Sequence, residues 1–282
     1  MSGTWDVLRR MAGQLGGLCG LVIVALVVLA ALVPGLLSTH DPDALDVLHR
    51  FADPSAEHWL GSDQLGRDLY SRLLFGARVA MEVALSAIAA SLLVGTLLGV
   101  LAALLPSGWE RPILILFDVI ASFPSLVLAL AIVAVFGPST VLVVIIVAIT
   151  LMPNFGRLTR AQVLSLRAAP FIEAERILGA SFGRIVVFHL LPNIAGPLVV
   201  LASIDIPVVI TIEAGLSFTG LGVRPPLASW GTLIYDGYAY LSDSPLPVVV
   251  ASAALGLATL GFTLFGEALR DAVDPRQKGH GG

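Results

Sequence analysis

The chain has 282 residues, of which 57% are hydrophobic and only 13% are charged. Soluble domains carry about 25% charged residues, and a soluble globule of this size could not bury so many apolar side chains. Composition therefore excludes an ordinary soluble enzyme. The net charge of -4 indicates no basic surface for nucleic acid, and the single cysteine, Cys19, permits neither an internal disulfide nor a cysteine-rich metal site.

Long stretches without charge predict an all-α membrane protein. A helix needs about 20 apolar residues to cross a hydrocarbon core of about 30 Å. Six spans are expected, at residues 15–37, 80–104, 113–136, 139–158, 194–213 and 246–266. Phe136-Gly137-Pro138-Ser139 favours a tight reversal between the third and the fourth. The fifth is the least regular, because it contains Pro197, Asp205 and Pro207.

The first span is expected to stay as an anchor, because its apolar run is longer than the core of about 7–15 residues in a cleaved signal peptide. Most of the 16 basic residues lie on one side of the membrane if the N-terminus is inside, which places both termini in the cytoplasm. The small-residue pairs Gly16/Gly20 and Gly95/Gly99 are expected to let helices approach closely.

The expected organisation has three parts. Residues 1–79 form the anchor helix and an external segment, residues 80–276 form the membrane-spanning core, and residues 277–282 form a cytoplasmic tail. The core includes a cytoplasmic loop, 159–193.

The cytoplasmic loop has the pattern of two short helices. Pro170 suits the first turn of a helix, Phe171, Ala174 and Leu178 fall on one face of it, and Gly179 ends it. Ser181 can cap a second helix that reaches Leu191, before Pro192 interrupts the chain. A protruding pair of this kind is suited to dock onto another protein.

The residues of this loop match a known pattern. Glu173-Ala174-Glu175, then Gly179, then His189-x-Leu191-Pro192, resembles the EAA loop of permease subunits of ATP-binding-cassette importers. Two positions depart from that pattern, with Glu175 in place of an alanine and His189 in place of an isoleucine. The resemblance implies a coupling helix that sits in a cleft of an ATPase subunit. The residues it implies for this contact are Phe171, Glu173, Ala174, Glu175, Gly179, Ala180 and Ser181.

Three further stretches narrow the resemblance to the C-type permease subunits of dipeptide and oligopeptide importers. They are 58–78 with His58-Trp59-Leu60-Gly61-Ser62-Asp63, 213–231 with Glu213-Ala214-Gly215-Leu216-Ser217-Phe218, and the end 269–276. This implies the type I importer permease fold in a prokaryotic plasma (inner) membrane. The implied partners are a second permease, ATP-binding subunits and an external solute-binding protein.

No site for nucleotide or metal is expected in the chain. The single lysine is Lys278 and no P-loop motif occurs, so ATP and Mg²⁺ are expected on partner subunits and the chain itself is not an enzyme. The five histidines show no zinc-ligand spacing, so no metal site is expected.

The candidate translocation-pathway residues are Asp205, Pro207, Glu213 and Ser217. A carboxylate at mid-bilayer costs roughly 2.5–3.5 kcal/mol, so Asp205 should face the bundle or water. Glu213 lies near a span end, where a solvated or interface-pairing carboxylate is expected. An ion-coupled secondary transporter that uses Asp205 and Glu213 stays open, as does an importer of a non-peptide solute such as a nickel complex or haem. A membrane-embedded hydrolase ranks last, because no nucleophile and base are suitably spaced.

Overall fold

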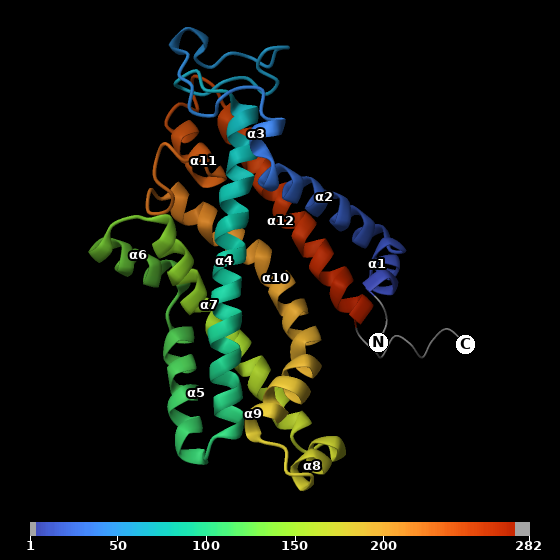
Figure 1. Cartoon of the computed structure of the whole chain (residues 1–282). Coiled ribbons are helices and arrows are strands. Elements are labelled where there is room, and N and C mark those ends of the chain that lie inside the picture. The colour runs from blue at the N-terminus through green and yellow to red at the C-terminus, as the bar shows by residue number, and fades with distance from the viewer. Residues whose placement is uncertain (1–3, 274–282) are drawn as a thin grey trace.

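The structure of the protein is a computed structural model that describes residues 4–273, and its regular elements there are all helical (Figure 1). Five helices are long and apolar enough to span a membrane, and one bent pair would make a sixth. The predicted all-α membrane fold is therefore confirmed. The helices are α1 (Thr4–Ala12), α2 (Leu15–Leu32), α3 (Pro34–Leu37), α4 (Leu69–Leu104), α5 (Ser107–Ser122), α6 (Ser125–Phe136), α7 (Thr140–Leu166), α8 (Pro170–Ile177), α9 (Phe182–Arg184), α10 (Leu191–Phe218), α11 (Trp230–Tyr238) and α12 (Leu246–Val273), with a 3-10 turn at Val47–His49 and a π-helical turn at Ile185–Leu190.

The span predicted at 80–104 begins earlier, at Leu69, because Asp68 caps α4 by accepting a hydrogen bond from the Ser71 backbone N–H. With 36 residues α4 is about 54 Å long, well beyond the hydrocarbon thickness. Its first turns carry polar residues that a hydropathy pattern does not mark as membrane. The boundary predicted at residue 79 thus lies inside a continuous helix.

The first and last predicted spans also end differently from the prediction. The span predicted at 15–37 is interrupted after Leu32, and Pro34 starts the separate turn α3, because proline lacks the N–H that would extend the ladder of α2. The last span, predicted to end at 266, continues to Val273.

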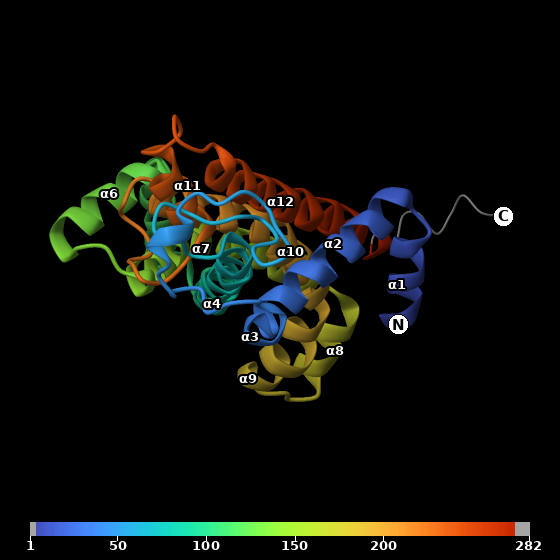
Figure 2. The same cartoon turned by 90° about the horizontal axis from the view of Figure 1, so that it is seen from above.

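The third predicted span, 113–136, is wrong as a single helix. α5 and α6 meet at an angle of 88° around Phe123-Pro124. Pro124 has no N–H to continue the α5 ladder and keeps Phe123 extended, so the chain turns there. Figures 1 and 2 show α6 projecting from the bundle on the side away from α1 and α2. The predicted reversal after Phe136 is confirmed, with Gly137 at φ +79°.

The fifth span is longer than 194–213, and the predicted break at Pro192 does not occur. Helix runs without interruption from Ile185 to Phe218, 34 residues. The predicted helix from Ser181 to Leu191 therefore forms from Phe182 onward, but it is wrong as a helix separate from the fifth span. The π-helical turn gives the reason: the Leu191 N–H donates to the Val186 carbonyl, which shifts the hydrogen-bond register just before the proline.

The core is built on close contact between α4 and α7. A Cβ on Gly99 would lie 2.4 Å from the Gly156 carbonyl oxygen, and a Cβ on Gly95 would lie 2.6 Å from the Met152 carbonyl oxygen. A Cβ on Gly20 would likewise lie 2.6 Å from the Phe265 backbone nitrogen of α12. Gly95, Gly99 and Gly20 are therefore close-packing positions as predicted. Gly16 is exposed, and a Cβ there would lie 3.7 Å from Leu264, so the prediction is wrong for this glycine. α12 in turn lies between α2 and α10.

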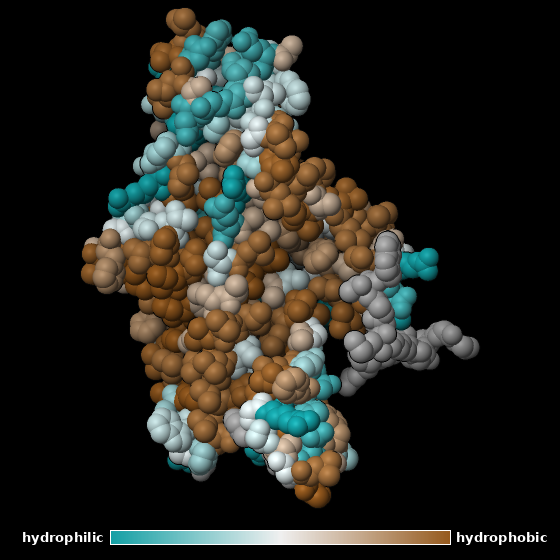
Figure 3. Space-filling view, in the orientation of Figure 1, coloured by the Kyte–Doolittle hydropathy of each residue, from teal (hydrophilic) through white to brown (hydrophobic). Residues whose placement is uncertain are grey.

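The outer surface is apolar around the middle of the molecule. Figure 3 shows a hydrophobic band over the helices, with hydrophilic residues gathered above and below it. Large apolar side chains of α2, α4 and α7, such as Leu26, Leu93 and Val141, point outward. A soluble protein rarely exposes a patch of this size, whereas a lipid bilayer covers it.

Candidate functional site

The loop between α7 and α10 lies at the end of the molecule opposite the 38–68 segment (Figure 1). Its helix α8 starts at Pro170, whose fixed φ suits a first helical turn. Ile172 is fully buried and packs into the same core cluster as Ile185 and Leu190. The Arg167 guanidinium donates to the Ala103 carbonyl at the end of α4, at 3.1 Å. The start of the loop is therefore tied to the end of α4 through Arg167, and α8 packs through Ile172 on the π-helical turn that leads into α10.

The opposite face of the loop exposes apolar side chains. Phe171, Ala174 and Leu178 share this face, as the sequence predicts. Ile177 and Leu178 are 82% and 80% exposed, and Phe188 of the π-helical turn adds to them. A group of exposed large apolar residues marks a surface for contact with protein or membrane.

The two acids of the loop have different surroundings. Glu175 is half-buried, and its Oε1 lies 3.5 Å from His189 Nε2. These are the two positions at which the sequence departs from the EAA pattern, and the structure brings them together. Glu173 is exposed. A hollow of about 670 Å³ beside the pair is lined by Glu175, Gly183, Arg184, Val187, Phe188 and His189.

Gly179 ends α8 as predicted. Its φ of +83° is a left-handed conformation, and the Ala180 N–H donates to the Glu175 carbonyl at 3.0 Å. A Cβ at this position would meet no atom within 4 Å. Glycine is therefore required here by backbone conformation alone and not by space.

The predicted pathway residues lie on α10 but do not form one cluster. Asp205 is buried, and its Oδ2 has no hydrogen-bond partner among the described residues. Glu213 is fully buried, so the expectation of a solvated or interface-pairing carboxylate is wrong. Two helical turns, about 12 Å, separate them along the axis. Pro207 is buried between them.

Glu213 and Ser217 do meet. The Ser217 hydroxyl donates to Glu213 Oε1 at 2.7 Å and accepts from the Val223 backbone N–H at 3.1 Å. The second oxygen of Glu213 has no partner among the described residues. This hydrogen-bonded pair connects the end of α10 to the following loop.

The 38–68 segment and the start of α4 hold a buried ionic cluster that the sequence analysis did not predict. Asp63 Oδ2 lies 2.7 Å from Arg67 Nε and 3.6 Å from Arg72 Nε. Both guanidinium groups are nearly fully buried, and each also approaches a more exposed carboxylate, Asp236 for Arg67 and Asp43 for Arg72. Asp63 is therefore the centre of the cluster.

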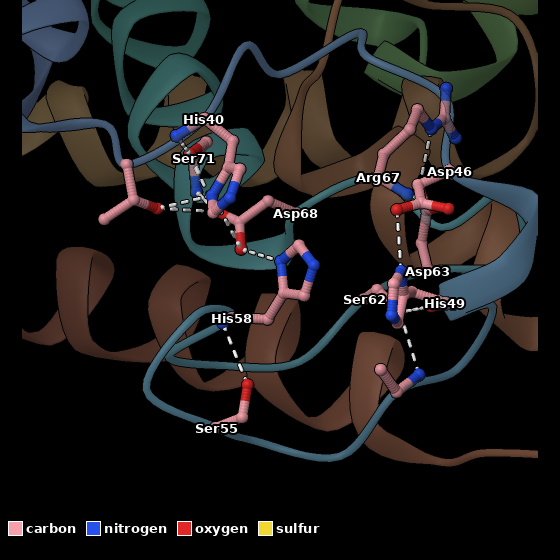
Figure 4. Close-up of polar contacts among 12 residues, drawn as sticks. His40, Asp46, His49, Ser55, His58, Ser62, Asp63, Arg67, Asp68 and Ser71 are labelled. Carbon is pink, nitrogen blue, oxygen red and sulfur yellow. Dashed lines mark hydrogen bonds and ion pairs between the residues drawn. The ribbon is translucent and has the colours of Figure 1, made fainter.

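Sequence reasoning missed a second cluster in the same segment. His40, His58 and Asp68 come together, with His58 and Asp68 pointing toward each other (Figure 4). The three residues follow no local spacing rule, because they come from separate parts of the segment. Only the long-range fold reveals them.

Comparison with known proteins completes the description. Residues 95–279 match the family described as binding-protein-dependent transport system inner membrane component. The chain is 38% identical to the dipeptide transport system permease protein DppC of Alkalihalophilus pseudofirmus, over 92% of this chain and 85% of that protein. It is 36% identical to the nickel transport system permease protein NikC of Escherichia coli, over 90% of this chain and 92% of that protein.

The structure resembles a chain of the MetNI methionine ABC transporter in an inward-facing conformation. The TM-score is 0.59 at 18% identity, covering 72% of this chain and 96% of that chain. This likeness shows a shared fold. Together with the family match and the two relatives, it leads to one conclusion: the chain belongs to the family of inner membrane components of binding-protein-dependent transport systems.

Proposed function

We propose that this chain pairs with a second permease subunit to form the membrane pathway of an ATP-driven importer of di- or oligopeptides. An external solute-binding protein would deliver the peptide. Family membership supports the importer, and the 38% identical dipeptide permease supports a peptide solute. Family membership also favours an importer over the ion-coupled transporter and the hydrolase.

ATP hydrolysis belongs to partner subunits in this proposal. The sequence has no P-loop, and its single lysine is Lys278. ATP and Mg²⁺ would therefore be bound by ATPase subunits that contact this chain.

Both termini and the α8 loop face the cytoplasm in this proposal, in a prokaryotic plasma membrane. The bias of basic residues supports this orientation. The first and last described helices also lie close together, because α1 packs against α12 and the Arg10 guanidinium lies 3.4 Å from the Ala272 carbonyl.

The observation that carries the coupling proposal is the two-sided character of α8. One side is anchored through buried Ile172, and the other presents Glu173 and exposed apolar residues. An ATPase subunit that binds the exposed side would displace α8 and, through the buried side, α10. Phe171, Ala174, Glu175, Ala180 and Ser181 complete the proposed contact region, with Gly179 setting its shape.

Asp205, Pro207, Glu213 and Ser217 are proposed pathway residues on α10. The unpartnered carboxylate oxygens of Asp205 and Glu213 support this role. A buried carboxylate oxygen without a partner is costly, and a solute or the second permease could supply the missing donor in another conformation.

Two glycines of the loop allow a matched test. Neither Gly179 nor Gly183 has an atom within 4 Å of an added Cβ, but only Gly179 has a positive φ. An L-residue in the left-handed conformation costs about 1–2 kcal/mol, so Gly179→Ala should distort the end of α8 while Gly183→Ala should not.

The assay measures ATP-dependent uptake of a labelled dipeptide by the complete complex in proteoliposomes, with subunit assembly checked by size-exclusion chromatography. Gly179→Ala and Glu173→Lys should reduce uptake without loss of assembly, and Gly183→Ala should behave as wild type. Normal uptake by both Glu173→Lys and Gly179→Ala would refute the coupling role. Uptake of nickel complex or haem in place of dipeptide would refute the peptide solute, and uptake driven by an ion gradient without nucleotide would refute the importer.

A further inference from the structure

The cluster of His40, His58 and Asp68 joins three places along the segment between α3 and α4. His40 follows the turn α3, His58 lies in the middle of the 38–68 segment, and Asp68 caps α4. One potential metal-ligand atom from each residue lies within 4.8 Å of the other two. Two imidazoles and one carboxylate are a ligand set that zinc and similar transition metals accept.

The spacing of the ligand atoms fits a small coordination sphere. Asp68 Oδ1 lies 3.0 Å from His58 Nδ1 and 3.9 Å from His40 Nδ1. Ligand atoms at bond lengths of about 2.0–2.1 Å in a tetrahedral site are about 3.3–3.4 Å apart. The two observed distances lie on either side of this value. Binding of an ion would require both rings to rotate from their stacked arrangement, so that one nitrogen of each points to the ion.

The carboxylate of Asp68 is already oriented for this purpose. Its Oδ2 accepts from the backbone N–H and the hydroxyl of Ser71, at 2.8 and 2.7 Å, which leaves Oδ1 facing the imidazoles (Figure 4). Burial by itself would raise the pKa of Asp68, but the hydrogen bonds from Ser71 and His58 outweigh it and the pKa lies below its ordinary value. The second oxygen of Asp68 is therefore held by Ser71, as the second oxygen is in many metal sites.

The cluster is accessible from one side. The Asp68 side chain is fully buried and that of His58 is 8% exposed, whereas that of His40 is 33% exposed. An ion and a water ligand can approach past His40. The two imidazole rings also stack, with centroids 4.7 Å apart, so no bulky side chain separates them.

From these contacts we infer that His40, His58 and Asp68 form a binding site for a divalent transition-metal ion of the Zn²⁺ type. The ion would tie the segment after α3 to the start of α4. It is a resident ion and not a transported solute, and the inference does not depend on the proposed function.

His49 provides a matched control within the same segment. Its ring centroid is 6.2 Å from that of His58, and its Nδ1 is 2.7 Å from Asp46 Oδ2. His49 is exposed and lies outside the three-residue cluster. Its loss should remove one imidazole from the segment without removing a ligand.

The experiment uses the complete complex, purified through a tag without histidine, stripped with a chelator and placed in lipid nanodiscs. Solute-binding protein and nucleotide are left out, so delivery of cargo cannot contribute. Co²⁺ is titrated while its visible absorption is recorded, Zn²⁺ is then added in competition, and thermal unfolding is measured with and without Zn²⁺. Wild type, His40→Ala and His49→Ala are compared.

Wild type and His49→Ala should each bind one Co²⁺ with similar affinity. His40→Ala should bind Co²⁺ at least about 10-fold more weakly, since even loss of an outer-shell partner weakens metal binding about 10- to 100-fold. Zn²⁺ should displace this Co²⁺ and raise the unfolding temperature of wild type and His49→Ala, but not of His40→Ala. Because His40 is partly exposed, His40→Ala should fold normally, which its unfolding curve without metal checks. Equal binding by wild type and His40→Ala, loss of binding in His49→Ala, or no saturable binding would overturn the inference.

Discussion

Replacing Asp63 by asparagine removes the charge at the centre of the buried ionic cluster. The carboxylate lies between Arg67 and Arg72 and also accepts the backbone N–H groups of Leu65 and Arg67, at 2.8 and 3.0 Å. Asparagine could keep these two backbone contacts through its oxygen, but its amide N–H₂ would face the guanidinium groups. The variant therefore isolates the ionic part of the interaction.

The size of the effect follows from burial. Removal of one partner from a buried ion pair costs about 3–5 kcal/mol, because it leaves an uncompensated buried charge. Asp43 and Asp236 lie 3.4 and 3.5 Å from the two arginines and are partly exposed, so they compensate in part. We expect the lower end of the range, about 3 kcal/mol. At about 2–4 °C per kcal/mol for a chain of this size, the unfolding temperature should fall by roughly 6–12 °C.

The assay is thermal unfolding of the complex in nanodiscs. The quantity measured at each temperature is the fraction of complex that remains folded and monodisperse. Glu82→Gln is the matched control, because it breaks another i,i+4 pair, Arg78 to Glu82 at 3.0 Å, in which both side chains are exposed. Exposed helix pairs contribute at most about 0.5 kcal/mol, so the control should shift by no more than about 2 °C. Equal small shifts for Asp63→Asn and Glu82→Gln would refute the reasoning from burial.

Three further outcomes are expected. Gly99→Val should separate α4 from α7 and lower the yield of monodisperse complex, at a cost of about 1–3 kcal/mol, whereas Gly256→Ala, with open space around it, should not. Ser217→Ala should lower unfolding stability by about 1–3 kcal/mol by removing both of its buried hydrogen bonds, and an unchanged midpoint would contradict this. The pKa of Asp68 is lowered in the folded state, so its contribution to stability is complete above the ordinary pKa near 4 and is lost as the pH falls through the folded-state pKa. Unfolding stability measured from pH 6 to pH 3 should show this loss on the acid side. Asp68→Asn should make the loss of stability smaller.

The sequence predicts the membrane spans well because a span is a local property of about 20 residues. The ends are less predictable, because polar residues continue a helix beyond the bilayer. α4 shows this most clearly: with Asp68 as its cap, the helix begins at Leu69, eleven residues before the predicted start.

Prolines are the main source of error inside the spans. Pro124 turns the chain by 88°, whereas the helix containing Pro192 continues without a break. The difference lies in the hydrogen bonds around each proline. A π-helical turn shifts the register before Pro192, and no such turn precedes Pro124. Single-sequence patterns do not reveal this register shift.

The candidate sites also contain some features that local sequence patterns predict and others that they do not. Gly179 and the exposed face of α8 follow from helix periodicity and C-cap chemistry, and the sequence predicts both. The burial of Glu213 and the meeting of His40 with His58 depend on contacts between distant segments. These could not be predicted from local patterns, because burial and contact between separate segments arise only in the folded chain.

The unbroken helix from Ile185 to Phe218 has a mechanical consequence. Its 34 residues extend about 51 Å as one continuous helix from the α8 loop to the end of α10, with Pro197 and Pro207 inside it. If the helix tilts by about 5° as a unit, one end moves by about 4 Å relative to the other. Under the proposed coupling, a displacement of the α8 loop would therefore reach the level of Glu213 with no intervening loop to absorb it.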